Sequence, residues 1–347
     1  QLDASLQLNK HQQEPLKMAL LASILNGDVQ YANHYYPEEL MGEDLVNYLN
    51  KALVKGQLTQ ANVVINGPLN KFPFINNEGV FVVDAELTDG TFRFDEQWPA
   101  ISAFDANLNF TNDSMLITAR QGVLSGLDVE GVTASMDSLS VEQVLAVNAV
   151  FEQEKPSSVA GLMNASPLAD SVGVTLEELN IQGDIEGVFD IILPLNDTEA
   201  VVAKGDVKLN KNQILLSAPE MHFTEVNGLV SFVNDKVTTQ GLALDWRGLP
   251  LKAEVLGYEQ EDAYLTTIDL QANWQKQHWL PQVPETLQAY FDSSIDWQGK
   301  LTLTNKVDGS FNYLLDINSD LVGSTLNLPA PFNKIADEER NLTVSVK

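Results

Sequence analysis

The sequence contains no cysteine, and basic residues are scarce. It has 347 residues with 20 Lys+Arg against 48 Asp+Glu, which gives a formal net charge of -28. The absence of cysteine excludes disulfides, thiolate metal ligands and cysteine nucleophiles. Because so acidic a surface repels phosphate backbones, we expect no nucleic-acid partner. The hydrophobic content of 44% and charged content of 20% are typical of ordered globular protein.

Long apolar runs are also missing. The densest one, residues 18–25, is interrupted by Ser23 and is much shorter than the roughly 20 residues of a membrane-spanning helix. The chain starts with Gln1 in an alternating apolar and polar pattern, and it ends at Lys347 in another. Both ends resemble cuts through strands, so we expect an excerpt from a longer protein.

Catalytic motifs are nearly absent. The four histidines form no HExxH or HxH spacing, and the chain has no GxSxG motif, no P-loop and no Asp-Thr-Gly. The Asn-Asp turns lack the further oxygen ligands of a calcium loop. The many carboxylates leave one enzymatic alternative, a carbohydrate-active enzyme that uses two of them as an acid–base pair. The sequence favours a protein that is not an enzyme and has no cofactor or metal.

The dominant pattern is period-two alternation, which places one set of side chains on one face of a strand. It recurs along the chain at 81–87, 181–185, 189–193, 205–209, 242–246, 249–255, 266–272, 295–303 and 311–317. We therefore predict a mainly β protein with a curled antiparallel sheet. Residues 88–90, 111–113, 233–235 and 308–309 have the Asn, Asp and Gly content of hairpin turns.

A few short amphipathic helices are expected between these strands. Apolar residues at helical spacing predict helices from Leu40 to Leu53, ended by Gly56, and at 159–163 and 284–291. Ser140 with Gln143 resembles a capping box and predicts a fourth helix at 141–151.

Equivalent residues recur at a step of 122. Asp84 matches Asp206, Leu87 matches Leu209, and Phe110 matches Phe232. The His34 and His278 segments are separated by twice that step. We therefore expect the tail of a preceding module at 1–36, repeat modules at 37–157 and 158–280, and a truncated module at 281–347.

Few helices are available to cover the apolar face of so many strands. Such a face needs a second layer or a ligand, and we expect an open groove that binds acyl chains. The alternative is a self-filled β-scaffold that binds proteins at its edges. The predicted groove residues, which are the apolar members of the alternating strands, are Phe81, Val83, Leu87, Phe92, Phe94, Leu108, Phe110, Val207, Leu209, Val230, Phe232, Leu244, Leu251, Ile268 and Leu270. Leu209→Asp in such a groove is expected to leave the protein folded and to block lipid passage.

Several short motifs, in order and spacing, resemble the YhdP-type AsmA-like envelope proteins of Gram-negative bacteria. Those that carry the resemblance are Tyr36-Pro37, Lys55-Gly56-Gln57-Leu58, Asn66-Gly67-Pro68-Leu69, Phe72-Pro73-Phe74, Gln97-Trp98-Pro99, Ser319-Asp320-Leu321-Val322-Gly323 and Leu328-Pro329-Ala330-Pro331-Phe332-Asn333-Lys334. The similarity covers most of residues 30–334. We expect the N-terminal membrane anchor and the far C-terminal part of that family to lie outside this sequence.

The resemblance implies a periplasmic location and a parent protein anchored in the inner membrane. It implies phospholipid as the partner, passed along a β-groove toward the outer membrane. Contacts with the two membranes would lie in regions absent from this sequence.

Overall fold

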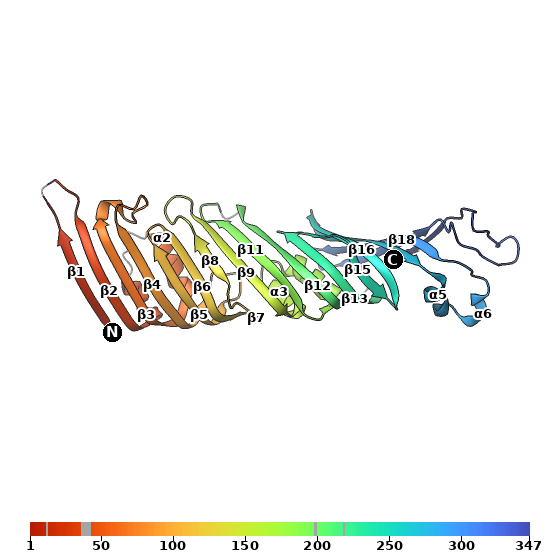
Figure 1. Cartoon of the computed structure of the whole chain (residues 1–347), viewed down its shortest axis with the longest axis horizontal. Coiled ribbons are helices and arrows are strands. Elements are labelled where there is room, and N and C mark those ends of the chain that lie inside the picture. Colours follow the sequence, from red (N-terminus) through yellow and green to blue (C-terminus); the bar gives the residue numbers. More distant parts are fainter. Residues whose placement is uncertain (12, 36–42, 198–199, 218) are drawn as a thin grey trace. The chain divides into compact units, whose positions relative to one another are not determined.

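A computed structural model describes the chain except for residues 12, 36–42, 198–199 and 218. Its strands form one 20-stranded sheet, and each pair of strands with a described register is antiparallel (Figure 1). The prediction of a mainly β, antiparallel fold is therefore confirmed. Tyr36-Pro37, Leu40 and the first module boundary lie outside the described residues.

The strands follow one another with few interruptions. The first are β1 (Leu2–Asn9), β2 (Lys17–Asp28), β3 (Leu53–Pro68), β4 (Val80–Phe92), β5 (Ile101–Thr111), β6 (Ser114–Leu124), β7 (Leu127–Asp128), β8 (Thr133–Met136), β9 (Val144–Glu154) and β10 (Ile181–Gln182). The others are β11 (Ile185–Pro194), β12 (Val202–Ser217), β13 (Glu220–Val233), β14 (Lys236–Thr239), β15 (Leu242–Trp246), β16 (Leu249–Gln260), β17 (Ala263–Trp274), β18 (Ile295–Lys306), β19 (Phe311–Ser319) and β20 (Leu342–Val346).

The described helices are short. They are η1 (Val29–Tyr35), α2 (Glu43–Ala52), η2 (Leu69–Lys71), α3 (Pro156–Asn164), the π-helix η3 (Ala169–Gly173), α4 (Val174–Leu179), α5 (Lys276–Trp279), η5 (Leu280–Gln282) and α6 (Glu285–Gln288). Three expected helices are thus present near their predicted places. Gly56, the expected stop of the first helix, lies inside β3 instead, because the chain pairs with β4 directly after α2.

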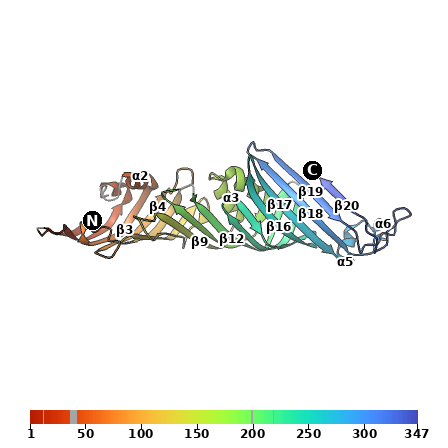
Figure 2. The same ribbon diagram turned by 90° about the horizontal axis from the view of Figure 1, so that it is seen from above.

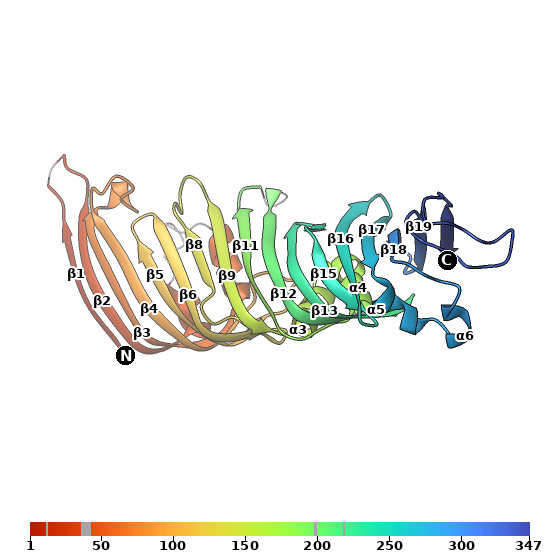
Figure 3. The ribbon, with the colours of Figure 1, turned by 45° about the vertical axis from the view of Figure 1, so that its right-hand side comes forward.

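The chain divides into two compact units. Unit 1 comprises Gln1–Val150, Ala165–Pro167 and Val188–Ala203, and unit 2 comprises the remainder. In unit 1, α2 lies over one face of the strands (Figure 2). In unit 2, α3 and α4 lie against one face of the strands (Figure 3). Val159 of α3 and Leu179 of α4 pack on the core of unit 2.

Each unit has its own apolar core. Unit 1 buries a small cluster made by Val29, Leu87, Phe104, Ala106, Ala119 and Val129. The cluster of unit 2 is larger and includes Leu209, Phe223, Val226, Leu251 and Leu301. Burial of this apolar surface is the main stabilising contribution in both units.

Strand register separates an apolar face from a polar one in unit 1. Val83 pairs with Val63 on one side and with Phe110 on the other. The neighbouring Asp84 lies on the opposite face, where it accepts a hydrogen bond of 2.9 Å from Asn109. A side-chain period of two therefore holds across these strands, as the sequence predicts.

The 122-residue step reappears in backbone conformation. Left-handed residues with positive φ occur in pairs at that step: Asp89 (49°) and Lys211 (56°), Ala103 (48°) and Glu225 (50°), Asn112 (49°) and Asn234 (52°), Ser125 (50°) and Arg247 (54°). The Asp89 amide donates to Asp105 Oδ1 at 2.8 Å, and the Lys211 amide donates to Asn227 Oδ1 at 3.0 Å. The fold thus uses a repeat of about 120 residues, while the module boundaries at 37, 158 and 281 stay predictions.

Two local predictions are wrong. Residues 144–154 form strand β9 rather than a helix, and Gln143 donates from Nε2 to the carbonyl of Leu139 at 2.9 Å within a turn. The β-branched Val144 and Val147 favour a strand, and pairing with β8 stabilises it.

Residues 88–90 form no hairpin. They lie inside β4, at an irregularity in its register where Asp89 is left-handed. The turns at 111–113, 233–235 and 308–309 do join consecutive strands, as predicted.

Candidate functional site

An apolar cavity of about 570 Å³ lies within unit 2. It is bounded by strands β13 and β15 to β20, by Trp279 of α5 and by the segment 321–326. This volume falls within the roughly 300–1,000 Å³ typical of small-molecule sites.

Four of the five tryptophans of the chain line this cavity. Trp246 and Trp274 stack with ring centroids 6.1 Å apart and an interplanar angle of 24°. Trp274 meets Trp297 edge to face at 5.1 Å, and Trp279 meets Phe291 in the same way at 5.6 Å. Such aromatic pairs contribute beyond simple area burial, so the aromatic wall is well defined.

Hydrogen bonds fix two of these indoles. Trp274 Nε1 donates to the carbonyl of Pro250 at 2.9 Å, and Trp279 Nε1 donates to that of Ser293 at 3.1 Å. Trp297 Nε1 is buried and has no hydrogen-bond partner among the described residues.

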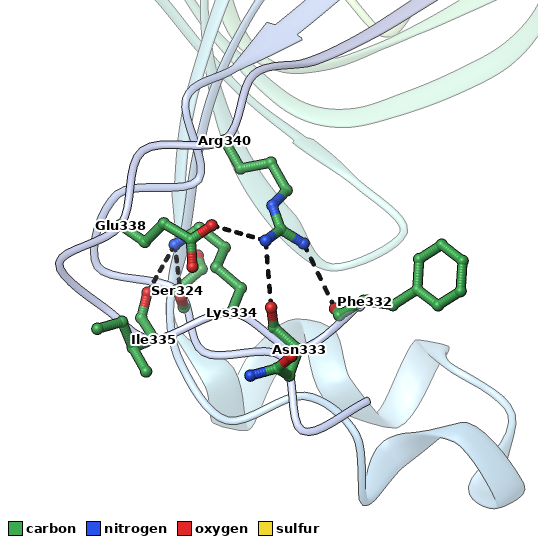
Figure 4. A network of polar contacts seen from close by, with 7 residues as sticks. All are labelled: Ser324, Phe332, Asn333, Lys334, Ile335, Glu338 and Arg340. Atoms are coloured by element: carbon green, nitrogen blue, oxygen red, sulfur yellow. Dashed lines mark hydrogen bonds and ion pairs between the residues drawn. The ribbon is translucent and has the colours of Figure 1, made fainter. Parts of the chain in front are cut away.

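One wall of the cavity is held by a buried lysine. Lys334 is 2% exposed, and its Nζ donates to the carbonyls of Ser324 at 2.8 Å and Ile335 at 3.1 Å (Figure 4). Leu326, which lines the cavity, forms antiparallel bridges with Phe291 and with Lys334. Lys334 therefore positions the segment that closes the cavity on this side.

Arg340 reinforces the same loop. Its Nη2 donates to the Asn333 carbonyl at 3.1 Å and to Glu338 at 2.6 Å (Figure 4). The hydrogen bond from Arg340 lowers the pKa of the Glu338 carboxyl, so this carboxyl stays ionised. The loop thus has a polar interior, while Phe332 and Ile335 are exposed on its surface.

Unit 1 presents an apolar face on its strands. Its central row runs through Ala22, Val63, Val83, Phe110 and Met115, each paired with the next across neighbouring strands. All five are half-buried rather than buried. This face therefore has apolar surface left to cover.

The predicted groove residues fall into two groups. Six are buried in the unit cores, namely Leu87, Leu209, Leu244, Leu251, Ile268 and Leu270. Nine are half-buried, namely Phe81, Val83, Phe92, Phe94, Leu108, Phe110, Val207, Val230 and Phe232. Leu251 and Leu270 line the cavity of unit 2. Contact of any of the fifteen with lipid stays a prediction.

The tryptophans and Lys334 were not predicted from the sequence as site residues. Two of the tryptophans could have been predicted from the alternating pattern. Trp246 ends the alternating apolar run 242–246, and Trp297 lies within the run 295–303. Trp279 and Lys334 lie outside strands and carry no periodic signal.

In the described part of the chain, no group of three or more His, Asp or Glu side chains could hold a metal ion. No helix there is both long and apolar enough to cross a membrane.

Comparison with known proteins places the chain in a family. A family model described as YhdP protein matches residues 1–347. The protein named intermembrane phospholipid transporter YhdP, from Escherichia coli (strain K12), is 32% identical over 330 residues, which is 95% of this chain and 26% of that protein. The chain therefore spans about a quarter of the length of that relative. No solved structure matches. With its whole length matched by the family model, this chain belongs to the YhdP family.

Proposed function

We propose that the chain is a periplasmic segment of an intermembrane phospholipid-transport bridge. Acyl chains lie on the apolar faces of its strands, and head groups stay in solvent. The parent protein is anchored in the inner membrane and passes lipid between it and the outer membrane. The Escherichia coli relative, named intermembrane phospholipid transporter YhdP, supports this proposal.

The cavity of unit 2 is the observation that carries the proposal. Its wall combines Leu251, Leu270, Leu315 and Ile317 with the four tryptophans. Such a lining suits hydrocarbon, because it offers few hydrogen-bonding groups to a polar ligand.

The physical basis of the proposed transport is passive. Each buried methylene contributes roughly 0.8 kcal/mol, and an apolar strand face offers many similar positions to a chain. Movement between such positions changes the free energy little, so a chain can slide. The direction of transport is then set outside this segment.

A self-filled scaffold is the second candidate. The observation in its favour is that six predicted groove residues, including Leu209 and Leu244, are buried by the protein's own side chains. On this reading the sheet binds partner proteins at its edges.

The test uses two neighbouring valines on opposite faces of β4. Val83 lies on the apolar face beside Phe110, and Val82 pairs with Thr111 on the other face. In the complete protein, Val83→Asp is expected to abolish lipid movement between the membranes, because a chain must desolvate the carboxylate to pass. Val82→Asp introduces the same charge and is expected to leave transport intact.

Transport by a folded Val83→Asp protein at the normal rate would contradict passage along this face.

Native mass spectrometry of the purified chain distinguishes the transport bridge from the self-filled scaffold. Bound phospholipid supports the bridge, and a species without any lipid supports the scaffold.

A further inference from the structure

A single arginine stands at the edge of the tryptophan-lined cavity. Arg247 forms the turn between β15 and β16 and directly follows Trp246, a lining residue. Its Cζ lies 5.3 Å from the centroid of the Trp246 ring. Gln282 Nε2 donates to the Arg247 carbonyl at 3.3 Å, which ties this turn to η5.

We propose that Arg247 and the cavity form a two-part site for a phospholipid, with the lipid phosphate at Arg247 and one acyl chain in the cavity. This inference rests on the proposed function and adds a residue that recognises the head group. The ligand is defined by its chemistry, an anionic phosphate joined to a hydrocarbon chain.

The contact with Trp246 holds the Arg247 guanidinium beside the aromatic wall of the cavity. Its N–H donors lie in the plane of the group, and they stay available for paired hydrogen bonds to phosphate. Arg247 is exposed, so a head group in solvent can reach it.

Arg247 differs from the other cations around the cavity. Lys276 is paired with Asp292 at 2.5 Å, Arg340 bonds Glu338, and Lys334 is buried against carbonyls. Arg247 has no carboxylate partner among the described residues. A cation that is not paired with a carboxylate, next to an apolar cavity, is complementary to an anionic amphiphile.

The preceding repeat shows that the turn itself does not need arginine. The equivalent turn there is Leu124-Ser125-Gly126, in place of Trp246-Arg247-Gly248. Ser125 and Arg247 have nearly the same φ, 50° and 54°. Arg247→Ser therefore removes the cation while keeping a residue that this backbone conformation accepts.

The test measures quenching of tryptophan fluorescence by bromine atoms on acyl chains. The protein is the full chain carrying Trp98→Phe, because Trp98 is the one tryptophan that does not line the cavity. The probes are phosphatidylglycerol with dibrominated chains and diacylglycerol with the same chains. We expect both probes to quench, and we expect Arg247→Ser to weaken phosphatidylglycerol binding about tenfold, as loss of one charge-assisted contact implies.

Diacylglycerol binding should be the same in both proteins, because it has no phosphate. Arg247→Lys should be intermediate, since it keeps the charge and loses the planar donors. Inorganic phosphate at millimolar concentration should not displace the brominated lipid. Displacement by phosphate alone would overturn the proposal in favour of a simple anion site.

Equal phosphatidylglycerol binding by Arg247→Ser and by the parent chain would overturn the role of Arg247 and leave the proposed function intact. Lipid that is detected in the protein by mass spectrometry but does not quench the tryptophans would overturn the cavity assignment alone. Absence of any bound lipid would contradict both the site and the proposed function.

Discussion

The phenol of Tyr264 donates a hydrogen bond of 2.8 Å to the backbone carbonyl of Asp235. This bond joins β17 to the turn between β13 and β14. Tyr264 is 3% exposed. Burial, with a smaller contribution from the Asp235 charge, raises the pKa of Tyr264 to about 12. The neutral phenol is thus part of the folded structure.

Stability should fall steeply in alkali because of Tyr264. Its pKa is higher in the folded state than the usual value near 10, so its contribution is complete below pH 10 and is lost as the pH rises toward 12. Two pKa units correspond to about 3 kcal/mol. Urea unfolding at pH 9 and pH 11.5 should show about 2 kcal/mol of this loss, because pH 11.5 is still below the folded-state pKa. Tyr264→Phe should lose correspondingly less between the two pH values. An equal loss in the two proteins would contradict the assignment.

Gly257→Ala should destabilise unit 2 through the same tyrosine. A Cβ at Gly257 would lie 2.7 Å from the Tyr264 hydroxyl oxygen. Overpacking of this kind typically costs about 1–3 kcal/mol. Combining Gly257→Ala with Tyr264→Phe removes the closest clashing atom, so a double-mutant cycle should show favourable coupling. Strict additivity would show that the two residues do not meet.

Lys334→Met should loosen the wall of the cavity. The substitution removes two hydrogen bonds from Nζ and leaves the carbonyls of Ser324 and Ile335 without that donor. Ser324 is buried, and an unsatisfied buried acceptor costs about 1–3 kcal/mol. Hydrogen exchange should rise in residues 320–341. Lys306→Met, at an exposed lysine, is the control and should leave exchange in that loop unchanged.

Leu209→Asp should unfold the surrounding sheet. The sequence placed Leu209 on an open groove, but the structure leaves it 3% exposed within the core of unit 2. A buried carboxylate without a partner costs several kcal/mol, so thermal unfolding should shift strongly downward. Asp206→Asn is the control, because Asp206 lies on the exposed face and accepts a hydrogen bond from Ser231. It should change the midpoint by only a few degrees.

Much of the strand pattern was predictable, because alternation is a local property of the sequence. β4, β15, β17 and β18 all cover runs recognised by period two. The strand β9 was not predicted, because Ser140 and Gln143 have the spacing of a helix N-terminus. Pairing with β8, which the local sequence does not show, stabilises the strand instead.

The cavity was less predictable than the strands. Its tryptophans come from β15, β17, β18 and α5, and their meeting depends on the register between strands such as Ala272 with Trp297. Alternation assigns a side chain to a face but does not show how far a second layer covers it. For this reason Leu209 and Leu244 were assigned to the groove although the core encloses them.

The paired left-handed residues have a consequence for protein engineering. Asp89 and Lys211 are one repeat step apart, and that step is an even number of residues. Deletion of residues 90–211 joins Asp89 to Asn212 and removes one whole step, so every retained strand keeps its inward and outward residues. A deletion longer or shorter by one residue would turn each side chain after the junction to the opposite face of the sheet. This would continue until a β-bulge or other register shift restored the original orientation. The length of such a protein can therefore change by whole repeats through recombination, without redesign of the strands that remain.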